Sequence, residues 1–279
     1  MREILAETIT RTVARLCIEA NCHLPEDMKT CIRAAREAEP WHQGQEILDR
    51  IIENFQVADA ENMPVCQDTG MACVFVKLGQ EVHILGDLNE AIHEGVRQGY
   101  REGYLRKSVV RDPLDRVNTG DNTPAVITYD IVPGDTVEIT LAPKGFGSEN
   151  MSAIKMLRPS DGVEGVKEFV VKTVEAAGPN PCPPIVVGVG IGGTFDKAAS
   201  LAKRALLRDA DSCHPDPYYA ALEAELLEKI NALGIGPQGF GGKTTALAVN
   251  IETFPTHIAG LPVAVNINCH VTRHQTEVI

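Results

Sequence analysis

The chain has 279 residues, of which 44% are hydrophobic and 23% charged, and its formal net charge is −12 at pH 7. A chain of this length can bury a substantial core, and its composition excludes the low-complexity and collagen-like classes. The acidic balance argues against nucleic acid as a partner, because phosphate binding requires a basic surface.

The amino terminus is charged and patterned as a helix, without the apolar region and cleavage site of a signal peptide. The longest apolar run covers residues 183–193 and is far shorter than a membrane span. We therefore expect a cytoplasmic protein.

The first hundred residues are predicted to be mainly helical. Apolar residues recur at helical spacing over residues 4–16 and 47–55, and a proline followed by two acidic residues at 25–27 is a typical helix start. A short strand is expected over residues 72–76, and another amphipathic helix over residues 88–104.

Residues 126–141 are predicted to form a hairpin, because Pro133-Gly134-Asp135 is a turn sequence followed by alternating apolar residues. The expected elements after it are helices over 163–177, 195–207 and 217–233, and strands over 185–189, 245–252 and 261–268. We expect a single α/β domain over residues 1–279, with mixed sheets flanked by helices. A helical N-terminal layer (residues 1–58) would precede an α/β core (residues 59–279).

Three of the eight cysteines stand in distinctive settings: Cys66 in PVCQDTG, Cys182 in NPCPPIVVGVGIGG and Cys269 in NINCHVTRH. Each lies just outside an apolar, strand-like run. Three thiolates from distant parts of a chain can hold a cubane iron–sulfur cluster whose fourth iron stays open and acts as a Lewis acid. The pattern therefore indicates a candidate hydro-lyase.

The other five cysteines are expected to be core or surface thiols, because a chain of this size does not need disulfide staples. They are Cys17, Cys22, Cys31, Cys73 and Cys213.

Two glycine-rich segments resemble nucleotide-binding motifs. Residues 188–193 match G-x-G-x-x-G between a strand and a helix, but regular βαβ units do not surround them, so we favour a role in shaping the site behind Cys182. Residues 234–245, GIGPQGFGGKTT, nearly match a P-loop, but Pro237 stands where a glycine is required and a helix precedes the segment. We expect a loop that ends a helix.

Asp68 follows Cys66 by two residues, which would bring its carboxylate near an open iron, where it could act as a general base. Asp-Thr-Gly is also good turn chemistry by itself, so an Asx turn is the simpler alternative. His257 precedes a strand, at the kind of loop where sites are built. His270 and His274 are four apart and could face one metal on a helix, although a solvated chain end is the simpler explanation.

Four basic residues lie in one short stretch: Arg106, Lys107, Arg111 and Arg116. A guanidinium is the natural clamp for a dicarboxylate, although basic clusters are usually only solvated surface. The segment KGFGSEN (residues 144–150) combines backbone flexibility with a hydroxyl, a carboxamide and a carboxylate, which suits either ligand contact or a tight turn.

Five motifs together resemble the α-type portion of class I fumarate hydratases, in the same order along the chain: PVCQDTG, KGFGSEN, NPCPPIVVGVGIGGTFDKAA, GIGPQGFGGKTTA and NINCHVTRH. L-tartrate dehydratase belongs to the same iron–sulfur hydro-lyase family. The resemblance implies that Cys66, Cys182 and Cys269 hold a [4Fe-4S] cluster. It also places Gln67 and Asp68 at the substrate, with Asp68 as an acid/base group.

The resemblance further implies substrate contacts for Arg106, for Gly145, Ser148 and Asn150 of the glycine-rich loop, and for His257. Phe146 departs from the all-glycine loop of longer family members.

Single-chain members of the family continue into a C-terminal domain with further basic residues, whereas this sequence stops at Ile279. The resemblance therefore implies an α subunit whose site is completed by a separate β subunit, in a hetero-oligomer that reversibly hydrates fumarate to L-malate. An L-tartrate dehydratase α subunit is the nearest alternative. A non-catalytic scaffold that holds zinc through the same cysteines and His270 is the alternative from another class.

Overall fold

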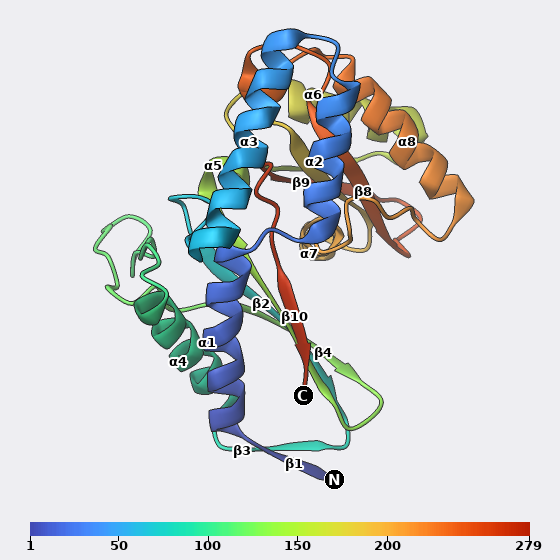
Figure 1. Ribbon diagram of the computed structural model, residues 1–279. Coiled ribbons are helices and arrows are strands. Elements are labelled where there is room, and N and C mark those ends of the chain that lie inside the picture. The colour runs from blue at the N-terminus through green and yellow to red at the C-terminus, as the bar shows by residue number, and fades with distance from the viewer. The chain divides into compact units, whose positions relative to one another are not determined.

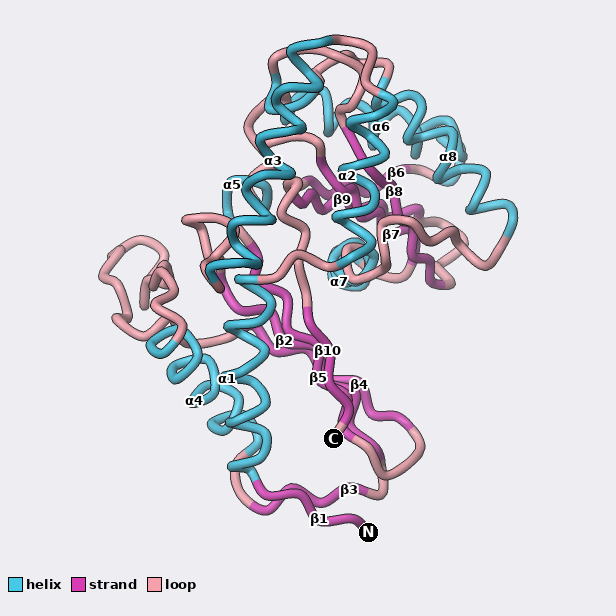
Figure 2. The backbone as a smooth tube through the Cα atoms, in the orientation of Figure 1, coloured by secondary structure: helices cyan, strands magenta, loops and turns pink.

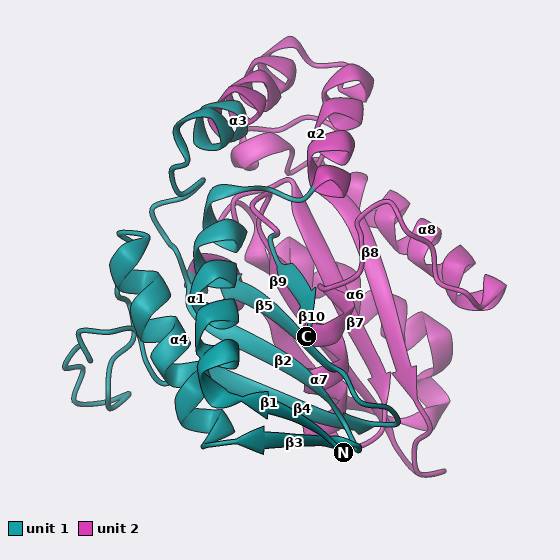
Figure 3. Ribbon diagram, turned by 60° about the horizontal axis from the view of Figure 1, so that its bottom comes forward, with its two compact units in different colours: residues 1–25, 55–146, 273–279 teal, residues 26–54, 147–272 magenta.

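The computed structural model describes residues 1–279 as helices and strands joined by turns and loops (Figures 1 and 2). The expected α/β class is confirmed: both four-stranded sheets are mixed and flanked by helices, and helices predominate near the amino terminus. The chain folds as two compact units, coloured separately in Figure 3. The first unit contains residues 1–25, 55–146 and 273–279, and the second contains residues 26–54 and 147–272. The proposed division at residue 58 stays a prediction.

The first unit is built on a sheet with the strand order β10-β5-β2-β4. Its strands are β2 (Met71–Gly79), β4 (Val126–Val132), β5 (Val137–Lys144) and β10 (Gln275–Val278). A separate parallel pair joins β1 (Arg2–Leu5) to β3 (Val82–Leu85). The first helix therefore begins at Ala6, not at residue 4 as the apolar pattern suggested.

The predicted hairpin over residues 126–141 is wrong. The chain does turn between β4 and β5, but β2 lies between them, parallel to β4 and antiparallel to β5. Residues 72–76 of β2 are buried on both faces of the sheet, so this strand takes an inner position.

Two helices pack together in the first unit, α1 (Ala6–Cys22) and α4 (Leu88–Glu102). They share a buried core with the sheet, to which Ile9, Tyr100 and Ile139 belong. The helix α3 (His42–Glu61) begins in the second unit and ends in the first.

The second unit is built on a sheet with the strand order β6-β9-β7-β8. Its strands are β6 (Ala153–Leu157), β7 (Ile185–Gly192), β8 (Ala246–Phe254) and β9 (Leu261–Asn268). Its helices are α2 (Glu26–Ala38), α6 (Gly162–Ala177), α7 (Phe195–Ala205) and α8 (Pro217–Asn231). Short turns of helix lie at α5 (Phe146–Glu149), η1 (Pro159–Asp161) and η2 (Pro237–Gly239). No helix of the chain is long and apolar enough to cross a membrane.

Alternate residues of β7 face opposite sides of the sheet, and different helices pack on each side. Ile185, Val187 and Val189 belong to a buried core shared with α6 and α8. Gly188 and Gly190 face α7: a Cβ added at Gly190 would lie 2.1 Å from the Ala198 carbonyl oxygen, and one at Gly188 would lie 2.2 Å from the Ala202 carbonyl oxygen. The glycines of the G-x-G pattern therefore serve close packing between helix and strand.

Replacement of Gly190 by alanine tests this close packing. We expect Gly190→Ala to lower the free energy of unfolding by about 3 kcal/mol or more, because backbone atoms of α7 must move to make room for the Cβ. Gly260→Ala is the matched control, since a Cβ at Gly260 would meet nothing closer than 3.7 Å. Chemical denaturation measures both variants, and equal stability of the two would contradict the packing account.

Candidate functional site

The turn from Cys66 to Gly70 precedes β2 in the first unit and holds three of the predicted site residues. The Cys66 sulfur accepts a hydrogen bond from the Asp68 backbone N–H at 3.4 Å, and it lies 3.5 Å from Oε1 of Gln67. The sulfur is therefore at the centre of a local turn, and the two residues expected beside a substrate flank it.

Both carboxylate oxygens of Asp68 accept backbone hydrogen bonds. Oδ1 accepts from the Gly70 N–H at 3.1 Å, so the Asx turn exists, and Oδ2 accepts from the Phe146 N–H at 3.0 Å. Gly145 permits this approach, because a Cβ there would lie 3.2 Å from Oδ2. Because β2 and β5 pair in antiparallel register, with Met71 opposite Lys144, the start of the glycine-rich loop lies beside Asp68.

Three buried side chains hold the carbonyl groups of this turn. The Tyr100 hydroxyl donates to the Thr69 carbonyl at 2.6 Å, and the Asn122 amide donates to the Gly70 carbonyl at 3.1 Å. Arg273 donates to the Asp68 carbonyl through Nη2. Arg273 is only 4% exposed, so it does not belong to a solvated chain end. Burial raises the pKa of Tyr100, which keeps this hydroxyl a donor.

The predicted basic stretch forms an exposed loop after α4. Arg106, Lys107 and Arg111 are solvent-accessible on it and form no ion pair, while the Arg106 carbonyl accepts a hydrogen bond from the Thr69 hydroxyl at 3.0 Å. The loop is therefore tied to the Cys66 turn through its backbone, and the Arg106 guanidinium is available to an anion.

In the second unit, Cys182 and Cys269 lie at the same end of the sheet. Cys182 precedes β7 and Cys269 follows β9, and these antiparallel strands pair Val186 with Asn268. The two loops are joined directly, because the His270 backbone N–H and ring Nδ1 lie 3.4 Å and 3.0 Å from the Cys182 carbonyl oxygen. Cys182 has a positive φ of 55°, an uncommon conformation for a residue other than glycine.

Ser148 and Asn150 reach the same end of this sheet, since they precede β6 and Ala153 pairs with Val265 of β9. Ser148 is buried. The neighbouring Glu149 accepts hydrogen bonds from Lys203 at 2.6 Å and from the Asn266 amide at 2.7 Å. This partly buried network ties Glu149 of the glycine-rich loop to Asn266, which lies three residues before Cys269.

His257 lies at the other end of the same sheet, in the loop between β8 and β9. The eight residues of β9 put about 26 Å between this loop and Cys269. The second unit therefore does not bring His257 to its two cysteines. The prediction that His270 and His274 could lie on a helix is wrong, because the segment between β9 and β10 has no regular secondary structure.

The five remaining cysteines behave as expected of core or surface thiols. Every cysteine of the chain is free of disulfides. Burial raises the pKa of Cys17 and of Cys22, and burial together with Asp211 and Asp27 raises the pKa of Cys31 to about 11. Thiols held in the protonated form are poor metal ligands.

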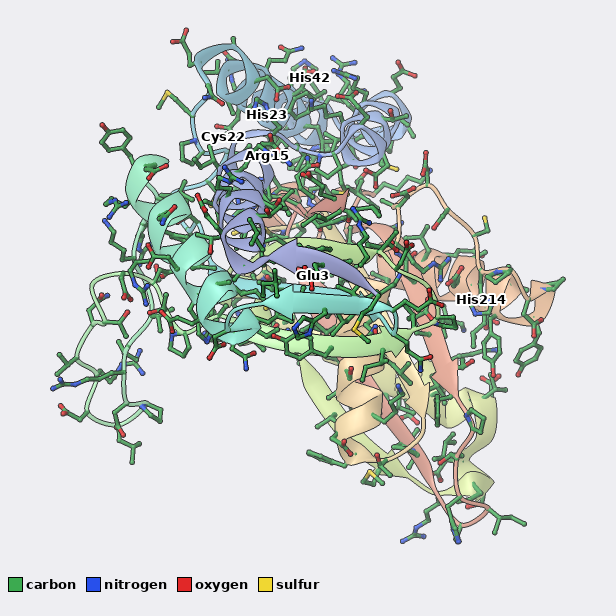
Figure 4. All side chains as sticks on the ribbon, turned by 90° about the horizontal axis from the view of Figure 1, so that it is seen from below. Glu3, Arg15, Cys22, His23, His42 and His214 are labelled. Carbon is green, nitrogen blue, oxygen red and sulfur yellow. The ribbon has the colours of Figure 1, made fainter.

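Two histidines outside the predicted site make local structural contacts. His23 follows Cys22 at the end of α1 (Figure 4), and its Nδ1 lies 3.0 Å from Oδ1 of Asp59. His214 precedes α8 (Figure 4) and accepts a hydrogen bond from the Asp216 N–H at 2.9 Å.

The loop that nearly matches a P-loop does bind an anion, and that anion is an internal carboxylate. Glu39 is 1% exposed and accepts hydrogen bonds from the backbone N–H groups of Lys243 at 3.0 Å and Thr244 at 2.8 Å. A Cβ at Gly242 would lie 2.9 Å from Oε1 of Glu39, so glycine is needed there. Burial favours a raised pKa for Glu39, but the hydrogen bonds from Lys243, Thr244 and Trp41 outweigh burial and lower this pKa.

The three predicted cysteine ligands have the chemistry that an iron–sulfur cluster requires. Cys66, Cys182 and Cys269 form no disulfide, lie in turns or loops next to strands and are at least partly accessible, unlike the buried Cys17 and Cys22. Two of the three lie in loops joined by hydrogen bonds within one unit. No group of three or more His, Cys, Asp or Glu side chains is gathered closely enough to hold a metal ion.

Comparison with known proteins identifies the family. A family model described as fumarate hydratase (Fumerase) matches residues 10–278. The chain belongs to this family. It is a hydro-lyase, and the resemblance inferred from the five motifs is confirmed.

Two relatives cover nearly the whole chain. The chain is 47% identical over 272 residues to a Methanocaldococcus jannaschii protein provisionally named L(+)-tartrate dehydratase subunit alpha, across 95% of both chains. It is 36% identical over 272 residues to the L(+)-tartrate dehydratase subunit alpha of Escherichia coli K12, across 96% of this chain and 89% of that protein.

The supporting residues around these loops were not found from the sequence. Tyr100 and Asn122 lie in segments that read as a helix and a loop, and Glu39 precedes an ordinary helix start. Only Arg273 stood within a recognised motif, NINCHVTRH, where no role was predicted for it. Their roles depend on contacts distant in sequence, which spacing alone does not reveal.

The Glu39 carboxylate gives a pH-dependent prediction. A lowered pKa stabilises the fold above the ordinary value of 4.5, and this contribution is lost as pH falls through the folded-state value. We expect Glu39→Gln to cost about 2 kcal/mol at neutral pH, because the amide nitrogen would face N–H donors, and to cost progressively less in acid. Denaturation from roughly pH 3 to 7 measures the difference, with the exposed Glu37→Gln as control. A difference that does not change with pH would refute the assignment.

Proposed function

We propose that this chain is the α subunit of an iron–sulfur hydro-lyase that removes water from L(+)-tartrate. Tartrate is proposed as the substrate because the relatives, at 36–47% identity over 272 residues, are named as L(+)-tartrate dehydratase α subunits. They favour tartrate over the fumarate expected from the motifs. Reversible hydration of fumarate is the second candidate, and the family model described as fumarate hydratase supports it.

In this proposal Cys66, Cys182 and Cys269 hold a [4Fe-4S] cluster. When bound, the cluster supplies an open iron that polarises a substrate hydroxyl and makes hydroxide a better leaving group. Two of the ligands lie in loops joined through the Cys182 carbonyl, and the third lies in a turn held at three successive carbonyls.

Asp68 is the proposed base. Its two oxygens accept one backbone hydrogen bond each, from Gly70 and Phe146, which fixes the carboxylate plane and leaves further lone pairs for a proton. In the dehydration Asp68 takes the proton from carbon while hydroxide leaves the adjacent carbon, so that one water is lost in total.

The remaining proposed contacts orient the diacid. Gln67 adjoins the cysteine, and the exposed Arg106 guanidinium can bind one carboxylate through two hydrogen bonds. Gly145, Ser148 and Asn150 would line the glycine-rich side of the site. His257 lies at the far end of its sheet, so a role for it at this chain's own cysteines is the least supported of these proposals.

A partner subunit is part of the proposal. The relatives are named as α subunits, so each is one chain of a larger enzyme. The chain's 38 acidic residues outnumber its 26 basic residues, so its overall charge of −12 repels a doubly charged anionic substrate. Burying two carboxylates without charged partners would cost several kcal/mol, so we propose that a β subunit supplies further basic groups.

The cluster ligands can be tested without a substrate. We expect Cys66→Ser, Cys182→Ser and Cys269→Ser each to lose the iron bound after anaerobic reconstitution, because a cubane lacking a thiolate ligand is labile. Cys73→Ser and Cys213→Ser are the matched controls and should keep wild-type iron. Full iron occupancy in any of the first three variants would remove that residue from the ligand set. A colourless protein that binds zinc instead would favour the scaffold alternative.

The activity is tested by assaying the chain, with and without a co-expressed L(+)-tartrate dehydratase β subunit, against L(+)-tartrate, fumarate and L-malate under anaerobic conditions. We expect turnover of L(+)-tartrate, and little activity from this chain alone. Asp68→Asn should keep its iron but lose about 100-fold or more in turnover, because proton transfer fails while the turn persists. The exposed Asp135→Asn serves as its control.

Three outcomes would change the proposal. Activity only on fumarate would favour the second candidate. Loss of iron together with activity in Asp68→Asn would leave Asp68 a purely structural role in the turn. Wild-type turnover by this chain alone would show that the partner subunit contributes no essential group to the active site.

A further inference from the structure

Gln238 occupies a backbone conformation that glutamine rarely adopts. It lies within η2 at φ 52° and ψ 17°. This is the left-handed region, which is unfavourable for residues other than Gly, Asn and Asp. A residue persists in such a conformation where the surrounding contacts require it. Those contacts lead directly to the cysteine loops.

Gln238 binds one carbonyl group twice. Its backbone N–H and its side-chain Nε2 both donate to the Pro183 carbonyl oxygen, each at 2.7 Å. Pro183 follows Cys182, whose own φ is 55°. The conformation of Gln238 therefore determines where the Cys182 loop is held.

The same amide reaches the Cys269 loop. Nε2 of Gln238 lies 3.2 Å from Nδ1 of His270, the residue after Cys269, and that Nδ1 lies 3.0 Å from the Cys182 carbonyl oxygen. This Nδ1 is therefore within hydrogen-bonding distance of both the Gln238 amide and the Cys182 carbonyl oxygen, where the two cysteine loops meet. The His270 backbone N–H donates to the same Cys182 carbonyl at 3.4 Å, so Gln238 lies beside the contact that joins the two cysteine loops.

The loop that carries Gln238 is itself rigidly supported. The Glu39 carboxylate binds its far end at Lys243 and Thr244. Across its base, the Gly241 N–H donates to the Ile235 carbonyl at 2.8 Å, and the Gly236 N–H donates to the Thr245 hydroxyl at 3.1 Å. Gln238 is therefore presented to the cysteine loops from a fixed base.

We propose that Gln238 is a positioning residue that sets the spacing and orientation of the Cys182 and Cys269 thiolates. The proposal rests on the proposed cluster for its function, but the geometry concerns the chain without any metal. Residues that orient metal ligands in this way typically change metal affinity about 10–100-fold when replaced.

Two variants remove the amide contact without adding backbone strain. Gln238→Gly relieves the positive φ, and Gln238→Asn keeps an amide on a residue that tolerates this φ but is too short to reach both loops. Asn62→Gly is the matched control, because Asn62 has a φ of 50° and an exposed side chain outside these contacts. Thermal unfolding establishes that each variant is folded.

The first readout uses the metal-free protein. Alkylation by iodoacetamide, followed by mass spectrometry, gives the rates at Cys182 and Cys269 relative to the exposed Cys213 in the same chain. We expect both relative rates to rise at least about fivefold in the two Gln238 variants and to stay at the wild-type value in Asn62→Gly. The second readout is the loss of reconstituted iron to a chelator, expected to be about 10–100-fold faster in the Gln238 variants.

Wild-type alkylation rates and wild-type iron retention in both folded Gln238 variants would overturn the proposal. A wild-type protein that takes up no iron would defeat the proposed function instead, while the alkylation rates would still decide the role of Gln238.

Discussion

The cysteine-bearing loops are held through their backbone carbonyl groups, and the candidate site depends on this constraint. In the first unit, Arg273, Tyr100 and Asn122 bind three successive carbonyls after Cys66. In the second unit, His270 and Gln238 bind the carbonyls of Cys182 and Pro183. Fixing a loop by its carbonyls limits the motion of the cysteine side chains and of the Asp68 carboxylate without using those groups as the anchors.

In each unit, the cysteine-bearing loops lie at the ends of strands of that unit's sheet. The inner strand β2 places the Cys66 turn beside the end of β5, and the antiparallel pair β7 and β9 places Cys182 beside Cys269. The glycines that resemble nucleotide motifs serve this scaffold. Gly188 and Gly190 admit α7 against β7, and Gly242 admits the Glu39 carboxylate into the loop that carries Gln238.

Much of this arrangement could be predicted from the sequence, because it depends on local patterns. Periodicity located most helices and strands, and the five motifs identified the family. The hairpin prediction failed because β2 lies between β4 and β5, and the local sequence of the two strands does not reveal an inserted third strand. Arg273 and Glu39 were missed for a related reason: each is buried by contacts with segments more than 200 residues away in sequence.

The central claim is that three cysteines hold a cubane cluster with one iron open to a C4 diacid. Mössbauer spectroscopy of the wild-type protein, reconstituted with ⁵⁷Fe and recorded with and without L(+)-tartrate and fumarate, tests it most directly. The account predicts a cubane spectrum in which one iron in four changes when the substrate is added, since only that iron lacks a thiolate ligand. A protein that binds no cubane iron, or a cluster whose Mössbauer spectrum stays the same when either diacid is added, would contradict this claim.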